Sequence, residues 1–538
     1  MKRAGGLVVL MAAVVPIILG GCSHQTSGVP IETAGQSTPL LRGIGPDPDT
    51  LDPQRARSVE AQTVLRDVCE GLTTLDPRGA VAPGVAAAWS MSADARTYVF
   101  HLRPLARWSN GERVVAQDFV AALQRLVDPT TASSYAQVID VIVNAADIVT
   151  GHKAPDTLGV HATDSGTLVI ELVQPAAYLP ALLSHPSTCP IHRPTLKSEG
   201  AGFTRPGTMV SDGAFVLKKW VPNTYIELAH NPFYWNDAHT RVPTVRYILS
   251  ADENAEFLRY RAGQLQITAT VPRGQYETIQ ADFPAQLKAF PKLGTYFYGF
   301  NLTRPPFRDM PGLRRALSLV IDRERLARDL LRVGEIPAYG WIPPGTAGYT
   351  PQSFDYKNMP IEARIAEARR LYTAAGYTAA NPLHVELRYN SGDVHTKLAV
   401  AIAATWKDTL GIDVTLTSVE FKTLLQDIDR GDVQIFRSSW SGDYNDAYSF
   451  LQYLKSDFGV NLIHYSNPNY DALLKQAASE ANPDARRRLL EQAERLALQD
   501  QPLIPIYFYT SKHLVSPRVD GWHGNIMDVV YSKDLALR

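Results

Sequence analysis

The chain combines strand-like and helix-like spacing of apolar residues, and this mixture limits its fold more than any other feature. Three short segments alternate as strands do: 98–102, 215–217 and 225–228. The Pro222-Asn223 turn between the last two predicts a hairpin. Helical spacing covers 361–375 and 484–499, with Glu494 on the expected solvent side. Because no internal repeat accompanies these patterns, we expect an α/β protein with mixed sheets.

Length and charge narrow the class further. The 538 residues are 45% hydrophobic and 20% charged, which is typical of a globular protein of several domains. Lys and Arg number 53 against 54 Asp and Glu, so no bulk positive field exists to hold a nucleic acid. Three cysteines without a CxxC pair exclude a disulfide framework and a Cys-rich zinc module.

The N-terminus predicts export. Lys2 and Arg3 precede an uncharged, mostly apolar run over 7–19, which Pro16 interrupts. A run of this length is shorter than the roughly 20 residues that a membrane-spanning helix needs. The pattern is that of a signal peptide.

Residues 19–22 read Leu-Gly-Gly-Cys, which resembles the lipobox of bacterial lipoproteins. In that reading 1–21 are the signal peptide, and Cys22 becomes the lipidated first residue of a 517-residue mature chain. The polar residues 22–37 then form a flexible tether. The alternative is an ordinary cleaved signal with an incidental cysteine.

Signatures of catalysis are missing from the sequence. It contains no G-x-S-x-G, H-E-x-x-H or G-x-x-x-x-G-K-[ST] motif. His185, Cys189 and His192 have helical spacing for a metal site, but Pro186 and Pro190 oppose that helix. The pattern favours a loop with structural or solvated histidines over a metal centre. We therefore expect no enzyme, no cofactor and no metal.

Residues 437–446 mix small, aromatic and acidic side chains where a strand ends. Serine and glycine here would let another backbone approach closely. Trp440 would form the wall of a pocket, and Asp443 would pair with an ammonium group. A surface turn with one core tryptophan explains the same residues equally well.

From about 44 to 534 the sequence contains a series of short motifs, in this order: Glu70-Gly71-Leu72, Ala82-Pro83-Gly84-Val85-Ala86, Tyr98-Val99-Phe100-His101-Leu102-Arg103, Trp108-Ser109-Asn110-Gly111, Gln117-Asp118-Phe119-Val120, His185-Pro186-Ser187-Thr188, Asn231-Pro232-Phe233-Tyr234-Trp235, Pro305-Pro306-Phe307, Ile321-Asp322-Arg323, Pro337-Ala338-Tyr339-Gly340 and Ala374-Ala375-Gly376-Tyr377. Through these motifs the chain resembles the periplasmic oligopeptide-binding proteins of ABC importers, the extracellular solute-binding protein family 5.

The resemblance implies a three-lobed periplasmic-binding-protein clamshell of α/β class, with mixed sheets and a hinge of crossing strands. Lobe I would comprise 38–69, 190–293 and 511–538, lobe II 70–189, and lobe III 294–510. The implied function is a monomeric, membrane-anchored lipoprotein of the periplasm or cell surface. It would capture short peptides in extended form and deliver them to an ABC import permease. Alternatives are a relative specialised for murein tripeptide, dipeptide or haem, or an envelope chaperone or sensor.

The resemblance also implies roles for particular residues. Asp443 would take the peptide ammonium, with Tyr509 beside it and Val59 as the backbone partner in lobe I. The strand that pairs with the ligand would contain Trp440, Ser441 and Gly442. Pocket aromatics, which the core explains as well, would be Tyr135 and Phe421.

For the ligand carboxylate, the resemblance implies Arg437 and His395, although Arg437 could instead pair internally. At two further cation positions this chain has Leu331 and Ile428. Arg332 and Arg430 lie nearby and could substitute. This departure leaves the preferred peptide length open.

Two cysteines offer a prediction outside the family pattern. The family's own cysteine pair corresponds here to Gly294 and Ser441, so that bridge is absent. Cys69 and Cys189 fall where the chain leaves lobe I for lobe II and where it returns. Two connections between the same lobes should run side by side, which allows a disulfide in an oxidising compartment. The alternative is two buried, unpaired thiols.

Overall fold

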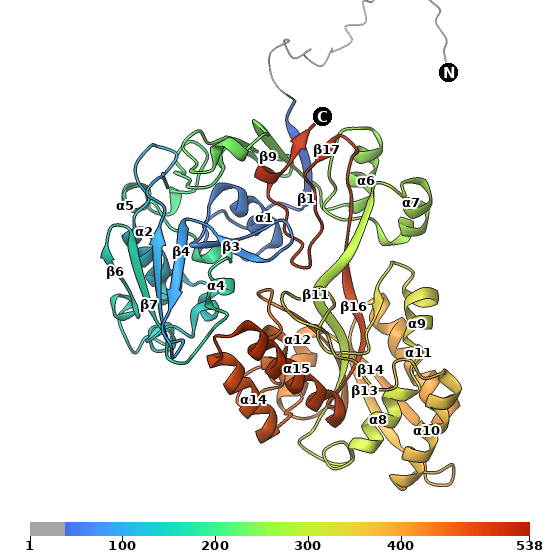
Figure 1. Cartoon of the computed structure of the whole chain (residues 1–538). Helices are drawn as coiled ribbons and strands as arrows, with labels where there is room; N and C mark the ends of the chain where they lie inside the picture. Colours follow the sequence, from blue (N-terminus) through green and yellow to red (C-terminus); the bar gives the residue numbers. More distant parts are fainter. Residues whose placement is uncertain (1–37) are drawn as a thin grey trace, which may run out of the picture. The chain divides into compact units, whose positions relative to one another are not determined.

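A computed structural model describes residues 38–538, which form three larger sheets surrounded by helices (Figure 1). The predicted signal peptide 1–21 and the tether 22–37, including Cys22, lie outside the described residues. Within 38–538 no helix is both long and apolar enough to span a membrane.

The first sheet has four strands, in the order β1-β10-β9-β8, with β1 parallel to β10 and the other pairs antiparallel. Its strands are β1 (Leu40–Gly45), β8 (Phe215–Val221), β9 (Tyr225–His230) and β10 (Thr244–Leu249). The predicted hairpin is β8–β9. Its turn contains Asn223 at a φ of 56°, a left-handed conformation that asparagine tolerates better than most residues.

The second sheet is antiparallel, in the order β4-β5-β7-β6, and lies within predicted lobe II. Its strands are β4 (Ala86–Met91), β5 (Thr97–Leu102), β6 (Val160–Asp164) and β7 (Thr167–Glu171). Two small ladders join β2 (Thr73–Leu75) to β3 (Val81–Pro83) and β17 (Val519–Asp520) to β18 (Ala536–Leu537).

The third sheet is mixed and has six strands, in the order β12-β16-β11-β15-β13-β14. The strands are β11 (Leu287–Phe300), β12 (Ile336–Pro337), β13 (His384–Asn390), β14 (Asp413–Val419), β15 (Ile435–Ser441) and β16 (Leu503–Leu514). The long strands β11 and β16 pair antiparallel and run between the regions predicted as lobes I and III (Figure 1). These are the crossing strands that the fold class implies.

The helices surround these sheets. They are α1 (Val59–Val68), α2 (Ala116–Val127), α3 (Ala145–Val149), α4 (Leu179–Leu182), α5 (Arg193–Glu199), α6 (Glu253–Arg261), α7 (Tyr276–Asp282), α8 (Pro311–Leu319), α9 (Arg323–Arg325), α10 (Ile361–Ala374), α11 (Asp393–Leu410), α12 (Phe421–Asp429), α13 (Tyr448–Leu451), α14 (Pro468–Ser479) and α15 (Pro483–Asp500). The two segments with helical spacing are α10 and α15, as predicted.

One prediction for α15 is wrong. Glu494 is fully buried, whereas helical periodicity placed it on the solvent side. Its carboxylate accepts hydrogen bonds from the backbone N–H groups of Trp341 (2.9 Å), Ile342 (3.0 Å) and Gln352 (2.9 Å) and from the Tyr349 hydroxyl (2.6 Å). Periodicity failed because a distant loop covers this face, and the carboxylate satisfies that loop's donors.

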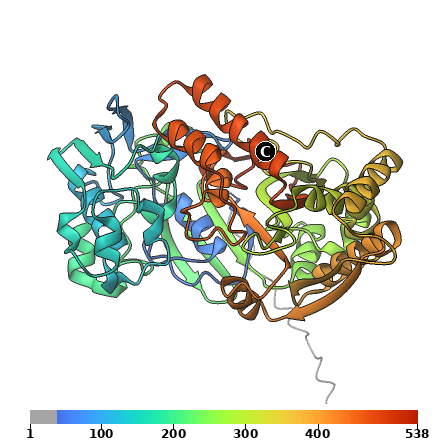
Figure 2. The same cartoon turned by 90° about the horizontal axis from the view of Figure 1, so that it is seen from below.

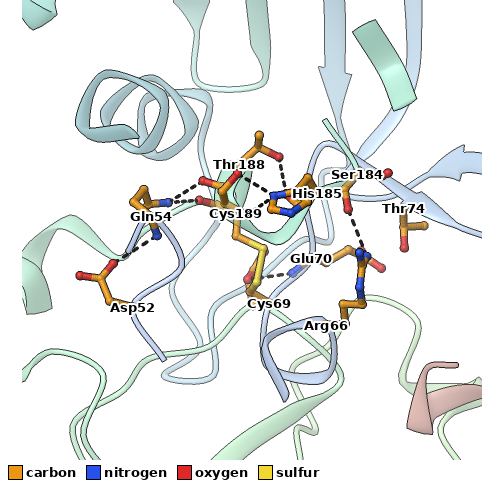
Figure 3. The surroundings of a disulfide bond; sticks show 12 residues. Asp52, Gln54, Arg66, Cys69, Glu70, Thr74, Ser184, His185, Thr188 and Cys189 are labelled. Carbon is orange, nitrogen blue, oxygen red and sulfur yellow. Dashed lines mark hydrogen bonds between the residues drawn. A yellow bond between two sulfur atoms is a disulfide. The ribbon is translucent and has the colours of Figure 1, made fainter. Parts of the chain in front are cut away.

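The disulfide prediction agrees with the structure, in which Cys69 and Cys189 are bonded with a Cα–Cα distance of 6.1 Å (Figure 3). Cys69 follows the last residue of α1, and Cys189 follows a short 3₁₀ turn. The Gln54 side-chain amide donates to the carbonyls of Ser187 and Cys189, both at 3.1 Å. These contacts hold the two connections side by side. Whether the exported protein forms the bond stays a prediction.

His513 lies on the crossing strand β16 with an acceptor at each ring nitrogen. Nδ1 is 2.9 Å from the Thr268 carbonyl oxygen, and Nε2 is 2.8 Å from Asp528 Oδ1. Both contacts are hydrogen bonds only when the ring carries two protons. Burial lowers the pKa of His513, but Asp528 and the Thr268 carbonyl together outweigh burial and raise that pKa above its ordinary 6.5. Burial likewise opposes the effect of His513 on Asp528, whose pKa falls to about 2.

This pair predicts a pH-dependent stability. A histidine whose pKa is raised by folding stabilises the fold below its unfolded pKa, and that contribution is lost as the pH rises through the folded pKa. We expect the melting temperature of the parent to fall as the pH rises above about 6.5, and this component to be absent in His513→Gln. Thermal unfolding of both proteins across this pH range is the measurement. Equal pH slopes would contradict the assignment.

Candidate functional site

The central feature of the site is an open edge on strand β15. On one side, β15 pairs with β11 along its whole length, from Ile435 opposite Phe300 to Ser441 opposite Gly294. On the other side it pairs with β13 only at Ile435 and Phe436. Within the described residues, the outer edge from 437 to 441 therefore has no strand partner. Such an edge can bind another extended chain.

Hydrogen bonding along β15 shows which residues direct their backbone N–H and C=O groups toward that edge. The Gly442 N–H donates to the Leu293 carbonyl at 3.0 Å, so this pair continues the antiparallel ladder with β11. Because bonded and non-bonded positions alternate in such a ladder, Trp440 and Ser438 also face β11. The N–H and C=O groups that face the open edge belong to Arg437, Ser439 and Ser441.

This alternation refines the residue set. Of the predicted backbone partners, Ser441 presents its backbone to the edge, whereas Trp440 and Gly442 bond toward β11. The Trp440 indole N–H donates to the Ser449 carbonyl at 2.8 Å, and its ring packs on Tyr453. Sequence reasoning missed Ser439 as an edge residue. Strand parity could have identified it once the register was known.

Asp443 lies just beyond the end of β15 and is an exposed carboxylate. No hydrogen bond or ion pair within 38–538 engages its side chain. The surrounding protein nevertheless partly desolvates it, which raises its pKa above the ordinary 3.8. A bound ammonium group would reverse this effect, because an opposite charge favours the ionised carboxylate.

Arg437 is the matching unpaired cation. Its side chain is only 8% exposed, yet no carboxylate of the described chain forms an ion pair with it, so the internal-pairing alternative is not observed. It donates to Asn390 Oδ1 at 3.1 Å and to the Tyr509 hydroxyl at 3.3 Å, and it lies 4.5 Å from the centre of the Tyr296 ring. Its buried Nε has no hydrogen-bond partner among the described residues. A buried guanidinium without a carboxylate is suited to receive an anion.

His395 joins this group through Tyr296, whose hydroxyl lies 3.2 Å from His395 Nδ1. Burial, aided by the charge of Arg437, lowers the pKa of His395 to about 4. At neutral pH the imidazole is therefore uncharged, and Arg437 supplies the positive charge. Sequence reasoning missed Tyr296 and Asn390, which shape this part of the site.

Three other predicted residues lie on different elements. Val59 is the first residue of α1 and is 69% exposed. Tyr135 is half-buried, and its hydroxyl accepts from Gln62 at 2.9 Å. Phe421 begins α12 and is 51% exposed, so it is not a core residue. Within 38–538, no hydrogen bond or ring contact joins these three residues to Arg437 or to the residues that contact it.

The other two positions at which the family resemblance implies a cation hold apolar residues here, and the arginines beside them are already in ion pairs. Leu331 and Ile428 are buried. Arg332 pairs with Glu277 at 2.6 Å, and Arg430 pairs with Asp432 at 2.8 Å. Both guanidinium groups are more than half exposed and already neutralised, unlike Arg437.

The His185 segment has structural contacts. His185 caps a 3₁₀ turn by accepting from the Ser187 N–H at 3.2 Å, and His192 caps α5. Cys189 is in the disulfide. The described residues contain no group of three side chains placed to hold a metal ion.

Comparison with known proteins identifies the family of this chain. The model for bacterial extracellular solute-binding proteins, family 5, matches residues 80–462. The chain belongs to this family.

Similar proteins match this family 5 protein over almost its whole length. From Escherichia coli K12, the probable deoxycholate-binding periplasmic protein YgiS is 40% identical, covering 91% of this chain and 92% of its own. The periplasmic murein peptide-binding protein MppA is 37% identical over 99% of both chains. The periplasmic oligopeptide-binding protein OppA is 36% identical over 99% of this chain and 97% of its own.

Among solved structures, the unliganded open form of MppA matches with a TM-score of 0.88 at 38% identity, covering 93% of this chain and 98% of that one. Another structure of Escherichia coli MppA matches with 0.72 at the same identity and coverage. The family 5 protein described here is thus more similar to the open-form structure than to this second structure.

Proposed function

We propose that this solute-binding protein captures short peptides with a free amino terminus and a free carboxylate, and delivers them to an ABC import permease. The peptide lies extended along β15, and its backbone pairs with the open edge at Arg437, Ser439 and Ser441. Asp443 takes the ammonium group and Arg437 the carboxylate. The protein performs no catalysis and acts as a monomer.

The proposal rests on one observation. Among the described residues, the open edge of β15 has a carboxylate, Asp443, just beyond one end and a guanidinium, Arg437, at the other, and neither has an ion-pair partner there. Backbone pairing gives affinity that does not depend on side-chain identity. The charges of Asp443 and Arg437 then require a ligand that has both an ammonium group and a carboxylate. Relatives named as oligopeptide-binding and murein peptide-binding proteins support a peptide ligand.

YgiS, named as a probable deoxycholate-binding protein, makes a steroid carboxylate the second candidate. Deoxycholate would satisfy Arg437 but has no ammonium group for Asp443. Calorimetry with trialanine and with deoxycholate separates the two, and mass spectrometry of ligands retained through purification provides an unbiased check. We expect trialanine to bind and deoxycholate not to. Binding of deoxycholate without trialanine would overturn the peptide proposal.

We further propose that Cys22 carries a lipid that anchors the protein in the membrane. We expect Cys22→Ala to move the exported protein from the detergent phase to the aqueous phase while leaving peptide affinity unchanged, because the tether separates anchor from fold. Detergent partitioning of parent and variant is the measurement, and calorimetry with trialanine is the control. Unchanged partitioning would remove the lipoprotein proposal.

A further inference from the structure

Asp443 is the free residue in a segment whose other members are fixed. Its neighbour Gly442 donates its N–H to the Leu293 carbonyl at 3.0 Å. A Cβ at Gly442 would lie 2.6 Å from Leu293 Cδ2, so the Leu293 side chain packs directly against this glycine. On its other side, Tyr444, Asn445 and Tyr448 are buried. The segment 442–448 thus holds one solvent-facing carboxylate on an anchored backbone.

Part of this anchoring comes from predicted lobe III itself. Asp446 forms a two-point ion pair with Arg486 of α15, with distances of 2.7 and 2.9 Å. Asn445 Oδ1 accepts from the Ala347 N–H at 2.9 Å. These contacts fix segment 442–448 to the rest of predicted lobe III, which also contains β15.

The rest comes from predicted lobe II. The Tyr178 ring stacks on Tyr444 with 5.2 Å between centroids and on Tyr448 with 4.8 Å. Asn445 Nδ2 donates to the Gly79 carbonyl at 2.8 Å. The Ala177 N–H donates to Ala478 at the end of α14, and Figure 2 shows the helices near residue 480 beside the part coloured for residues 70–189.

We propose that predicted lobe II positions the ammonium receptor, and that Tyr178 is the positioning residue. Tyr178 touches Tyr444 and Tyr448, which both follow Asp443 in the chain. Its ring thus holds the residues directly after Asp443 and fixes the direction in which the carboxylate points. Rigid placement before binding lowers the ordering cost of the complex. The inference rests on the proposed role of Asp443. It adds that predicted lobe II, which does not contain β15, sets the direction of the Asp443 carboxylate.

The test compares two affinities, for trialanine and for N-acetyl-trialanine, because their ratio reports the ammonium interaction alone. We expect Tyr178→Leu to lower this ratio at least tenfold. Tyr178→Phe should retain it, because the Tyr178 hydroxyl makes no hydrogen bond within residues 38–538 and phenylalanine keeps the stack. The matched control is Phe354→Leu, which removes a stacked ring on Tyr356 elsewhere in predicted lobe III.

Hydrogen exchange of 442–448 gives a second readout, in which Tyr178→Leu should lose protection and Phe354→Leu should not. Tyr178→Met, which keeps bulk without a ring, replaces Tyr178→Leu if that variant does not fold. An unchanged ratio in a folded variant, or a loss equal to that of Phe354→Leu, overturns the inference. If Asp443→Asn also leaves the ratio unchanged, the proposed function itself fails, which distinguishes the two failures.

Discussion

Asp443→Asn is expected to weaken trialanine binding by about 3–5 kcal/mol, because it leaves a desolvated ammonium group without its charged partner. This corresponds to a loss in affinity of about 10²–10³-fold or more. The fold should be unaffected, since Asp443 makes no hydrogen bond or ion pair within the described chain. Calorimetry measures the affinity and thermal unfolding checks the fold.

Two comparisons make this result specific. N-acetyl-trialanine lacks the ammonium group, so the parent should bind it weakly and Asp443→Asn should weaken it little further. Asp457→Asn serves as the matched control, because Asp457 is 70% exposed and pairs with Lys455 on the same predicted lobe. Equal binding of both peptides by the parent would show that Asp443 does not hold the ammonium.

Local periodicity was sufficient to predict several elements. The alternating segments became β5, β8 and β9, and the helical segments became α10 and α15. Each is an amphipathic element whose pattern directly records which face is buried. Periodicity failed at Glu494, because the donors that satisfy it come from residues more than 140 positions away.

The site required information that no local pattern holds. The segment 437–446 was ambiguous by itself, and only the family resemblance assigned a role to Asp443. The open edge exists because β13 leaves β15 after Phe436, which is a property of two strands that are distant in sequence. The chemistry of Arg437 likewise depends on Tyr296, Asn390 and Tyr509 from three other segments.

Removal of the Cys69–Cys189 disulfide is expected to reduce the free energy of unfolding by about 4–5 kcal/mol, because the bond closes a loop of 120 residues and restricts the unfolded chain. Denaturant unfolding of the parent and of the double variant Cys69→Ala/Cys189→Ala measures the difference. Both sulfur atoms are buried, so part of any loss reflects packing. Unfolding the parent with and without reductant separates the covalent effect, since reduction leaves both side chains in place.

Formation of the bond can be decided without reference to stability. The chain has three cysteines, so Cys22→Ala leaves Cys69 and Cys189 as the sole pair. Non-reducing peptide mapping of this variant, exported and purified without reductant, should find the two peptides joined. Free-thiol labelling of both residues would disprove the bond. A linked pair would mean that the two connections to predicted lobe II are covalently tied, so that this lobe cannot separate from α1 when the crossing strands bend.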